Sequence, residues 1–203
     1  MHEISVVVTN YNYGKFIGRC IRSLLNQTLE NSMYEIIVVD DCSTDDSLEI
    51  LNLFRDQIKL VTLDKNMGLA YTSNAGIKNC RSRYFVRVDA DDYVHPSFLE
   101  TLLLGFELVG AEVEAVSCDY FRVTQDGTII NYGKQELNPI ACGVAFKIDA
   151  FESIGFYDSN LRINEEVDFM KRFNNANMKI FNIGLPLYRY VQHDHSLTKR
   201  VPK

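Results

Sequence analysis

Short runs of apolar, mostly β-branched residues alternate with stretches of helical spacing along the first half of the chain. The expected strands are 4–10, 34–40, 58–63 and 84–89, and the expected helices are 15–25, 43–54 with Ser43 as N-cap, and about 69–80. Strands that are apolar throughout and alternate with helices form parallel sheets covered on both faces. The pattern therefore predicts an α/β fold whose ligands gather at the carboxyl ends of the strands.

The second half of the chain mixes shorter strands with helices, which predicts a smaller mixed β region. The expected elements are a helix at 95–108 with Pro96 in its first turn, a hairpin at 113–133 that turns at Asp126-Gly127, a strand and helix at 143–151, a helix start at 164–173, and short strands at 178–184 and 186–193 before a polar tail.

Composition narrows the class of protein. The chain has 203 residues, of which 46% are hydrophobic and 24% charged, as in one globular domain. Its net charge of −6 and lack of a basic stripe argue against a nucleic-acid-binding protein. We expect no signal peptide and no transmembrane segment, because no apolar run approaches bilayer thickness. The five cysteines lack CxxC spacing, which indicates reduced, mostly buried thiols.

Carboxylates cluster where two of the expected strands end. Asp40 and Asp41 end the second strand, and Asp89, Asp91 and Asp92 end the fourth. Two like charges about 4 Å apart repel by ~4 kcal/mol near a protein surface. The cluster is therefore either dispersed in a solvated loop or offset by a divalent cation, and hard oxygen ligands suit Mg²⁺ or Mn²⁺. The spacing alone leaves both interpretations open.

A calcium loop is a competing interpretation of "DCSTDDS", and it is rejected. Such a loop that begins at Asp41 needs Gly at its sixth position and Glu at its twelfth, where this chain has Asp46 and Asn52. Asp45 and Asp46 are better explained as acidic residues that favour the first turn of a helix.

Two other polar features are candidates for ligand contact. The loop "TNYNYG" lacks the GxGxxG pattern of a dinucleotide site, but it offers Asn10 and Asn12 as hydrogen-bonding groups and Tyr11 and Tyr13 as faces for a flat base. Asn74 lies on an otherwise apolar face of its predicted helix. It is either a core amide with its hydrogen bonds satisfied or an amide turned toward a donor ligand.

Five stretches in this order resemble family 2 of the GT-A glycosyltransferases. They are "SVVVTNYNYGKFIGRCIRSLLNQTL", "YEIIVVDDCSTDDS", "NMGLAYTSNAGIKNCRSRYFVRVDADDYV", "NEEVDFMKR" and "YRYVQHDHSLT". The resemblance implies a GT-A fold, with a Rossmann-like, mostly parallel central sheet flanked by helices. It also implies a single domain over 1–203, in which about 1–95 bind the nucleotide sugar and about 96–203 form the acceptor side.

The resemblance further implies donor-binding roles in the first half of the chain. Thr9 and Tyr11 would border the nucleobase, with Tyr11 stacked on it. Asp41, together with Asp40, would hydrogen-bond the base or ribose, and Asp89 would contact the ribose. UDP is the expected nucleotide.

The same resemblance places a divalent metal, Mn²⁺ or Mg²⁺, on Asp91, where it bridges the diphosphate. His193 stands where the family often has a histidine near the metal, so we predict it as a second metal-binding residue. We expect His195 to be an exposed residue of the tail.

Inversion at the anomeric carbon, which the resemblance implies, needs one general base near the acceptor hydroxyl. The family usually has Glu-Asp at the start of the helix that supplies it, whereas this chain has Glu165-Glu166. We predict Glu166 as the base, with Glu165 as second choice.

The expected function is thus sugar transfer from a nucleotide donor to a saccharide or lipid-linked acceptor in glycan biosynthesis. We expect a cytoplasmic protein with at most peripheral contact at the inner membrane. The alternative is a catalytically inactive GT-A-like protein that binds nucleotide sugars or serves as a scaffold. A nucleotidyltransferase would need a basic, glycine-rich loop where the chain reads "TNYNYGK", and a phosphohydrolase would need D-x-D where it reads "VTNYN".

Overall fold

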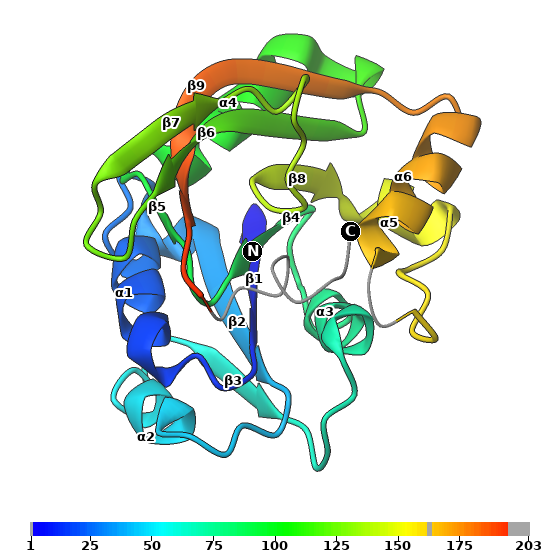
Figure 1. The fold of residues 1–203 in the computed structure, drawn as a ribbon. Helices are drawn as coiled ribbons and strands as arrows, with labels where there is room; N and C mark the ends of the chain where they lie inside the picture. The colour runs from blue at the N-terminus through cyan, green and yellow to red at the C-terminus, as the bar shows by residue number, and fades with distance from the viewer. Residues whose placement is uncertain (1, 162–163, 195–203) are drawn as a thin grey trace.

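A single mixed sheet runs through the molecule (Figure 1). The computed structural model describes residues 2–161 and 164–194. Within them the sheet has nine strands: eight follow the order β3-β2-β1-β4-β8-β6-β9-β5, and β7 pairs with β6 outside this path. The strands are β1 (Ile4–Asn10), β2 (Tyr34–Asp40), β3 (Lys59–Thr62), β4 (Tyr84–Asp89), β5 (Tyr93–Val94), β6 (Ala115–Val123), β7 (Ile129–Gly133), β8 (Val144–Lys147) and β9 (Ile180–Val191).

The first four strands form the parallel part of the sheet that the sequence pattern predicts. β1 lies at its centre and pairs in parallel with β2 on one side and with β4 on the other. From β1 the chain first builds outward to β2 and β3 and then crosses to β4, so the strand order reverses beside β1. In open α/β sheets ligands bind in the crevice at this reversal, beyond the carboxyl ends of the strands.

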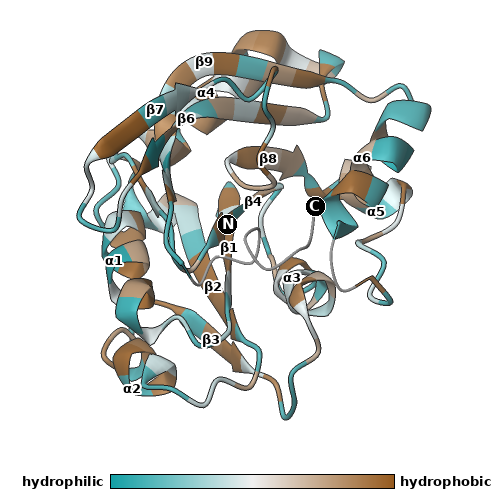
Figure 2. Cartoon of the chain, viewed as in Figure 1, coloured by the Kyte–Doolittle hydropathy of each residue, from teal (hydrophilic) through white to brown (hydrophobic). Residues whose placement is uncertain are grey.

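Helices cover both faces of the sheet. They are α1 (Gly14–Leu25), α2 (Ser47–Asn52), α3 (Leu69–Ile77), α4 (Phe98–Val109), α5 (Ile148–Ser153) and α6 (Glu165–Asn175), with short 3₁₀ turns at Asn31–Met33 and Gly110–Glu112. Val6 and Val8 point into a core with residues of α1 and α4, whereas Val7 points into a second core with residues of α3, α5 and α6. In Figure 2 these helices carry both hydrophobic and hydrophilic residues, as helices that cover a sheet do.

Two expectations about element boundaries are wrong. The two short strands expected at 178–184 and 186–193 are one long strand, β9, which pairs in parallel with β6 through shifts of register. Gly184 takes a positive φ of 72°, so the chain passes this point as an irregularity of the strand and does not turn. Ser43 is not the N-cap of α2, which begins at Ser47; the Ser43 hydroxyl instead donates to Asp40.

The other helices and strands expected in the second half are confirmed. β6 and β7 form the antiparallel hairpin, β8 leads directly into α5, and α4 begins two residues after Pro96. None of the helices in the described ranges has the length and apolar character that a membrane span requires.

Close packing of α3 on β1 gives a test of the fold. A Cβ added at Gly76 would lie 2.3 Å from Val7 Cγ1, so Gly76→Ala should overpack this interface. We expect a loss of about 1–3 kcal/mol in the free energy of unfolding, measured by urea denaturation. In a free helix the exchange of glycine for alanine is favourable by about 1 kcal/mol. The reverse exchange at the adjacent position, Ala75→Gly, measures this intrinsic helix preference in the same helix. A Gly76→Ala protein as stable as the wild type would contradict the close approach.

Candidate active site

The loops after β1 and β2 are locked together at the reversal of strand order. The strand register places Thr9 beside Asp89 and Asn10 beside Asp40. Asn10 Nδ2 donates to Asp40 Oδ1 over 2.7 Å, and the backbone amide and hydroxyl of Ser43 donate to the same carboxylate over 2.9 and 2.6 Å. Asp40 is fully buried and holds the loop that follows β2, so its predicted contact with a donor stays a prediction.

Asp41 links the end of β2 to the loop before α3 through hydrogen bonds. Its two carboxylate oxygens accept from the backbone amides of Met67 over 2.6 Å and Gly68 over 2.9 Å. Beside this buried carboxylate, Thr9 is buried and Tyr11 is 44% exposed. Tyr11 is therefore an exposed aromatic ring in the loop after β1, and its stacking on a nucleobase stays a prediction.

Asn74 has its polar atoms occupied within the protein. Its amide nitrogen donates to the Tyr157 carbonyl over 2.8 Å and to Ser159 Oγ over 3.2 Å, and its oxygen accepts from the Tyr157 amide over 3.1 Å. These bonds tie α3 to the segment before α6 and match the core interpretation. The donor-binding role of Asn74 stays a prediction, and it would require these bonds to open.

Asp89, Asp91 and Asp92 gather after β4, with one ligand atom of each within 4.8 Å of the others. Asp92 is buried, and its oxygens accept from the Tyr188 hydroxyl and the Val191 amide, both over 2.7 Å. Burial and the neighbouring charges of Asp91 and Asp89 raise the pKa of Asp92 well above its usual value. Asp92 thus ties β9 to the carboxylate loop, which we define as residues 89–92, and Asp89 and Asp91 remain the more exposed carboxylates of this loop.

The residues present suit a hard divalent cation. Asp89 Oδ1 is buried without a hydrogen-bond partner, and desolvation raises the pKa of Asp89 although 30% of its side chain is open to solvent. Asp91 Oδ2 lies 2.8 Å from His193 Nε2. The His193 ring stacks on Phe16 at 4.5 Å and meets Tyr13 edge-on at 5.8 Å. A carboxylate oxygen that lacks a hydrogen bond, a second carboxylate and a histidine ring packed between aromatic side chains are a donor set that Mn²⁺ or Mg²⁺ accepts.

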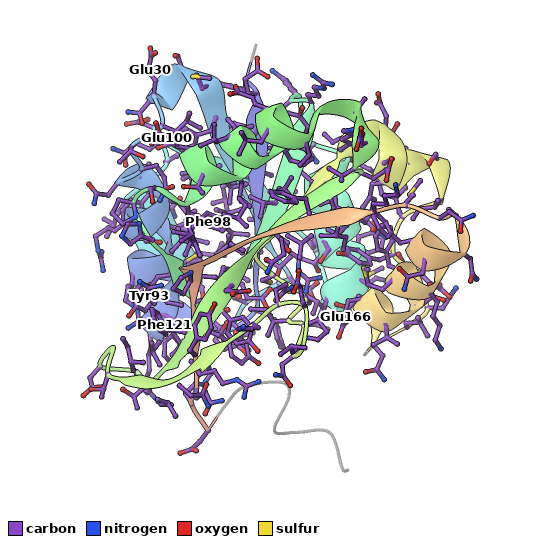
Figure 3. The ribbon with its side chains drawn as sticks, turned by 90° about the horizontal axis from the view of Figure 1, so that it is seen from above. Glu30, Tyr93, Phe98, Glu100, Phe121 and Glu166 are labelled. Carbon is purple, nitrogen blue, oxygen red and sulfur yellow. The ribbon has the colours of Figure 1, made fainter. Side chains whose placement is uncertain are left out.

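The two glutamates at the start of α6 lie in different surroundings. Glu165 is buried and forms an ion pair with Arg87 Nη1 over 3.3 Å. Glu166, labelled in Figure 3, is only partly buried, and its pKa is raised first by desolvation and then by the charge of Glu165. Among smaller contributions, the charge of Glu166 raises the pKa of Asp89, so the two carboxylates lie close enough for their charges to interact. Glu166 is therefore the more accessible of the two carboxylates, and the role of either as a base stays a prediction.

Two residues at the site were missed by sequence reasoning. Arg87 is a charged residue in the middle of the otherwise apolar part of β4, and its position two residues before Asp89, on the same face of the strand, was an available signal. Tyr188 gave no such signal, because it lies 96 residues after Asp92 and reaches it only through the pairing of β9. His195 lies outside the described residues.

Comparison with known proteins identifies relatives of the chain. The model of the family "Glycosyl transferase family 2" matches residues 5–177. The glycosyltransferase GlyG of Streptococcus pneumoniae is 32% identical over 97% of this chain and 73% of its own length. The poly(ribitol-phosphate) β-N-acetylglucosaminyltransferase TarP of Staphylococcus aureus is 34% identical over 50% of this chain and 32% of its own length.

Solved structures share the fold. Residues 1–349 of S. aureus TarS, crystallised with UDP-GlcNAc, superpose with a TM-score of 0.83 and 20% identity, over 99% of this chain and 62% of that one. The mannosyltransferase PcManGT of Pyrobaculum calidifontis, solved with GDP-Man and Mn²⁺, gives a TM-score of 0.75 at 16% identity, over 96% of this chain and 58% of that one. The expected GT-A fold is confirmed, and this chain spans about three-fifths of either structure.

The Tyr188 hydroxyl offers a test of the site's internal support. It donates to Asp92 Oδ2 and accepts from the Asp89 amide over 3.2 Å. Tyr188→Phe leaves a buried carboxylate short of a partner and should lower the free energy of unfolding by about 1–3 kcal/mol in chemical denaturation. Tyr71→Phe, at an exposed tyrosine, should change it by less than about 0.5 kcal/mol. Equal effects of the two exchanges would show that the hydroxyl does not support the loop.

Proposed function

Because the chain belongs to glycosyltransferase family 2, we propose that it transfers a sugar from a UDP-sugar to a saccharide or lipid-linked acceptor, with inversion at the anomeric carbon. The observation that supports the proposal is that three kinds of side chain lie toward one edge of the sheet: an exposed aromatic ring after β1, the open carboxylates at the end of β4, and a partly buried carboxylate on α6. The names of TarP and of a Bacillus poly(ribitol-phosphate) β-glucosyltransferase support a role in glycan biosynthesis. A cytoplasmic location is part of the same proposal.

The donor half of the site would form around β1, β2 and β4. Tyr11 would stack on the base beside Thr9, and Asp41, with Asp40 and Asn10 holding its loop, would face base and ribose. Asp89 would contact the ribose and lies beside Thr9 in the sheet. The complexes of TarS with UDP and UDP-GlcNAc support UDP as the nucleotide.

The diphosphate would lie against the carboxylates after β4. A divalent metal, Mn²⁺ or Mg²⁺, would be held by Asp91 with Asp89, His193 at its side, and would neutralise the charge of the leaving diphosphate. The Mn²⁺ in PcManGT supports this choice of ion. Within the protein, the rings of Phe16 and Tyr13 keep His193 directed at Asp91.

Glu166 would take the proton of the acceptor. The acceptor oxygen forms a bond to the anomeric carbon as the bond from that carbon to the diphosphate breaks, and the hydroxyl proton passes to a carboxylate. No cation of the described residues lies within ion-pair distance of Glu166, whereas Glu165 is neutralised by Arg87. A carboxylate with a raised pKa is the better proton acceptor near neutral pH.

Nucleotide binding tests the donor site. Calorimetry should show UDP binding that weakens at least about tenfold without Mn²⁺ and to a similar degree in Asp91→Asn, since each change removes the bound cation that would hold the diphosphate. Asp56→Asn, at an exposed aspartate of the α2–β3 connection, should bind as the wild type does. GDP and dTDP should bind more weakly than UDP. Failure of every nucleotide to bind in any condition would contradict the proposal.

Turnover tests the base. Glu166→Gln should lower the rate of sugar transfer, or of slow donor hydrolysis, by roughly 10²- to 10⁴-fold while UDP still binds. Glu165→Gln should cost less, and the exposed Glu152→Gln should have no effect. The readout is release of UDP from a UDP-sugar in a coupled assay. Intact donor binding without turnover in the wild type, over a panel of acceptors, would favour the non-catalytic alternative.

A further inference from the structure

Arg87 is a fully enclosed cation at the centre of the molecule. It belongs to β4, and only 3% of its side chain is exposed. Its guanidinium lies over the Tyr157 ring at 5.6 Å, and Nη1 reaches Ser73 Oγ at 3.5 Å. A buried charge is tolerated only when charged or hydrogen-bonding groups replace the water it has lost. The identity of those groups therefore shows what the residue holds in place.

Two carboxylates from different elements serve this one guanidinium. Nη1 lies 3.3 Å from Glu165 Oε1 at the start of α6, and Nε lies 3.6 Å from Asp89 Oδ1 at the end of β4. Both Nε and Oδ1 are buried and lack hydrogen bonds, so the contact between Arg87 and Asp89 is an ion pair without a hydrogen bond. The planar fork of arginine can direct separate N–H groups at two partners, which a lysine cannot reproduce.

The bridge decides which glutamate of α6 remains available. Glu165 has its charge matched by Arg87 and is sealed inside. Glu166, the next residue, lies partly exposed near the same groups: Glu165 on its own helix, Arg87 and Asp89 on β4, and the ring of Tyr157. The helix start is also held from its far side, where Arg172 binds Asp168 and the carbonyls of Ile154, Gly155 and Phe156.

We propose that Arg87 is a positioning residue that ties the donor-side carboxylate Asp89 to the first turn of α6 through Glu165, and so presents Glu166 as the free carboxylate of the site. The inference rests on the proposed function for the role of Glu166. It adds a residue that contacts neither donor nor acceptor but sets the distance between the two halves of the site.

The charges of Glu165 and Arg87 predict opposite shifts in the pKa of Glu166 for two variants. Glu165 raises the pKa of Glu166 and Arg87 lowers it. Arg87→Met should therefore raise the pKa of Glu166, and Glu165→Gln should lower it. Because the base acts when deprotonated, the acidic limb of the rate profile should move to higher pH in the first variant and to lower pH in the second. A purely structural role for Arg87 would not move the two profiles in opposite directions.

The experiment measures the pKa of Glu166 directly, by NMR of protein labelled with ¹³C at the glutamate carboxyls. The signal of Glu166 is the one missing in Glu166→Gln. This titration needs no acceptor and no turnover, so it separates failure of the inference from failure of the proposed function. Shifts of opposite sign in Arg87→Met and Glu165→Gln support the inference, and an unmoved pKa in both variants overturns it.

Turnover distinguishes the effect of the Arg87 charge from the effect of its bridge between Asp89 and Glu165. Arg87→Lys keeps the charge, so the Glu166 pKa should stay near that of the wild type, while kcat falls roughly 10- to 100-fold because the bridge is lost. UDP release should show this loss in kcat more than in the KM for the donor. The double variant Arg87→Met/Glu165→Gln should be no slower than Arg87→Met alone. Additive losses, or a wild-type kcat in Arg87→Lys, would overturn the positioning role.

The control is that each variant is folded and as stable as the comparison requires. Each variant is compared with the wild type by near-UV circular dichroism and thermal unfolding before its titration is interpreted. Glu165→Gln preserves the shape of the side chain and tests the inference even where Arg87→Met does not fold. Arg81→Met removes an arginine at an exposed position before β4 and should change neither the Glu166 pKa nor kcat.

Discussion

Burial of charge at the carboxyl ends of the central strands is the constraint on which this structure depends. Asp40, Asp92, Glu165 and Arg87 are almost wholly enclosed around the point where the strand order reverses. An isolated charge in such a place would be too costly to keep, so the fold must supply each one with partners. Many of the hydrogen bonds and ion pairs at the site supply these partners.

The partners divide the acidic residues into two groups. Asp40, Asp41, Asp92 and Glu165 have their oxygens occupied by backbone amides, hydroxyls or Arg87, and they hold loops and helices in position. Asp89, Asp91 and Glu166 keep capacity for a ligand, and the proposed chemistry uses these three. Four supporting carboxylates thus surround three open ones, because side chains that bind a ligand must be held in a rigid surrounding.

Strand β9 shows how the second half of the chain completes a site that the first half begins. It returns in parallel to β6, carries Tyr188 to Asp92 and Asp89, and ends just before His193, which reaches Asp91. The helix α6 approaches from the opposite side and meets β4 through Glu165 and Arg87. The carboxylate loop is thus held from two directions by elements far apart in sequence.

The amino-acid pattern was enough to predict the alternation of strands and helices, the parallel order of the first half, the edge of the sheet where the carboxylates gather and the family, because these follow from local periodicity and contiguous motifs. It misjudged β9, since Gly184 and Pro186 resemble a break that the long pairing with β6 overrides. Which carboxylates have partners became visible only in the folded chain. Those partners lie far along the chain, 78 residues from Arg87 to Glu165 and 102 from Asp91 to His193, and no local pattern encodes a contact that depends on how the whole sheet closes.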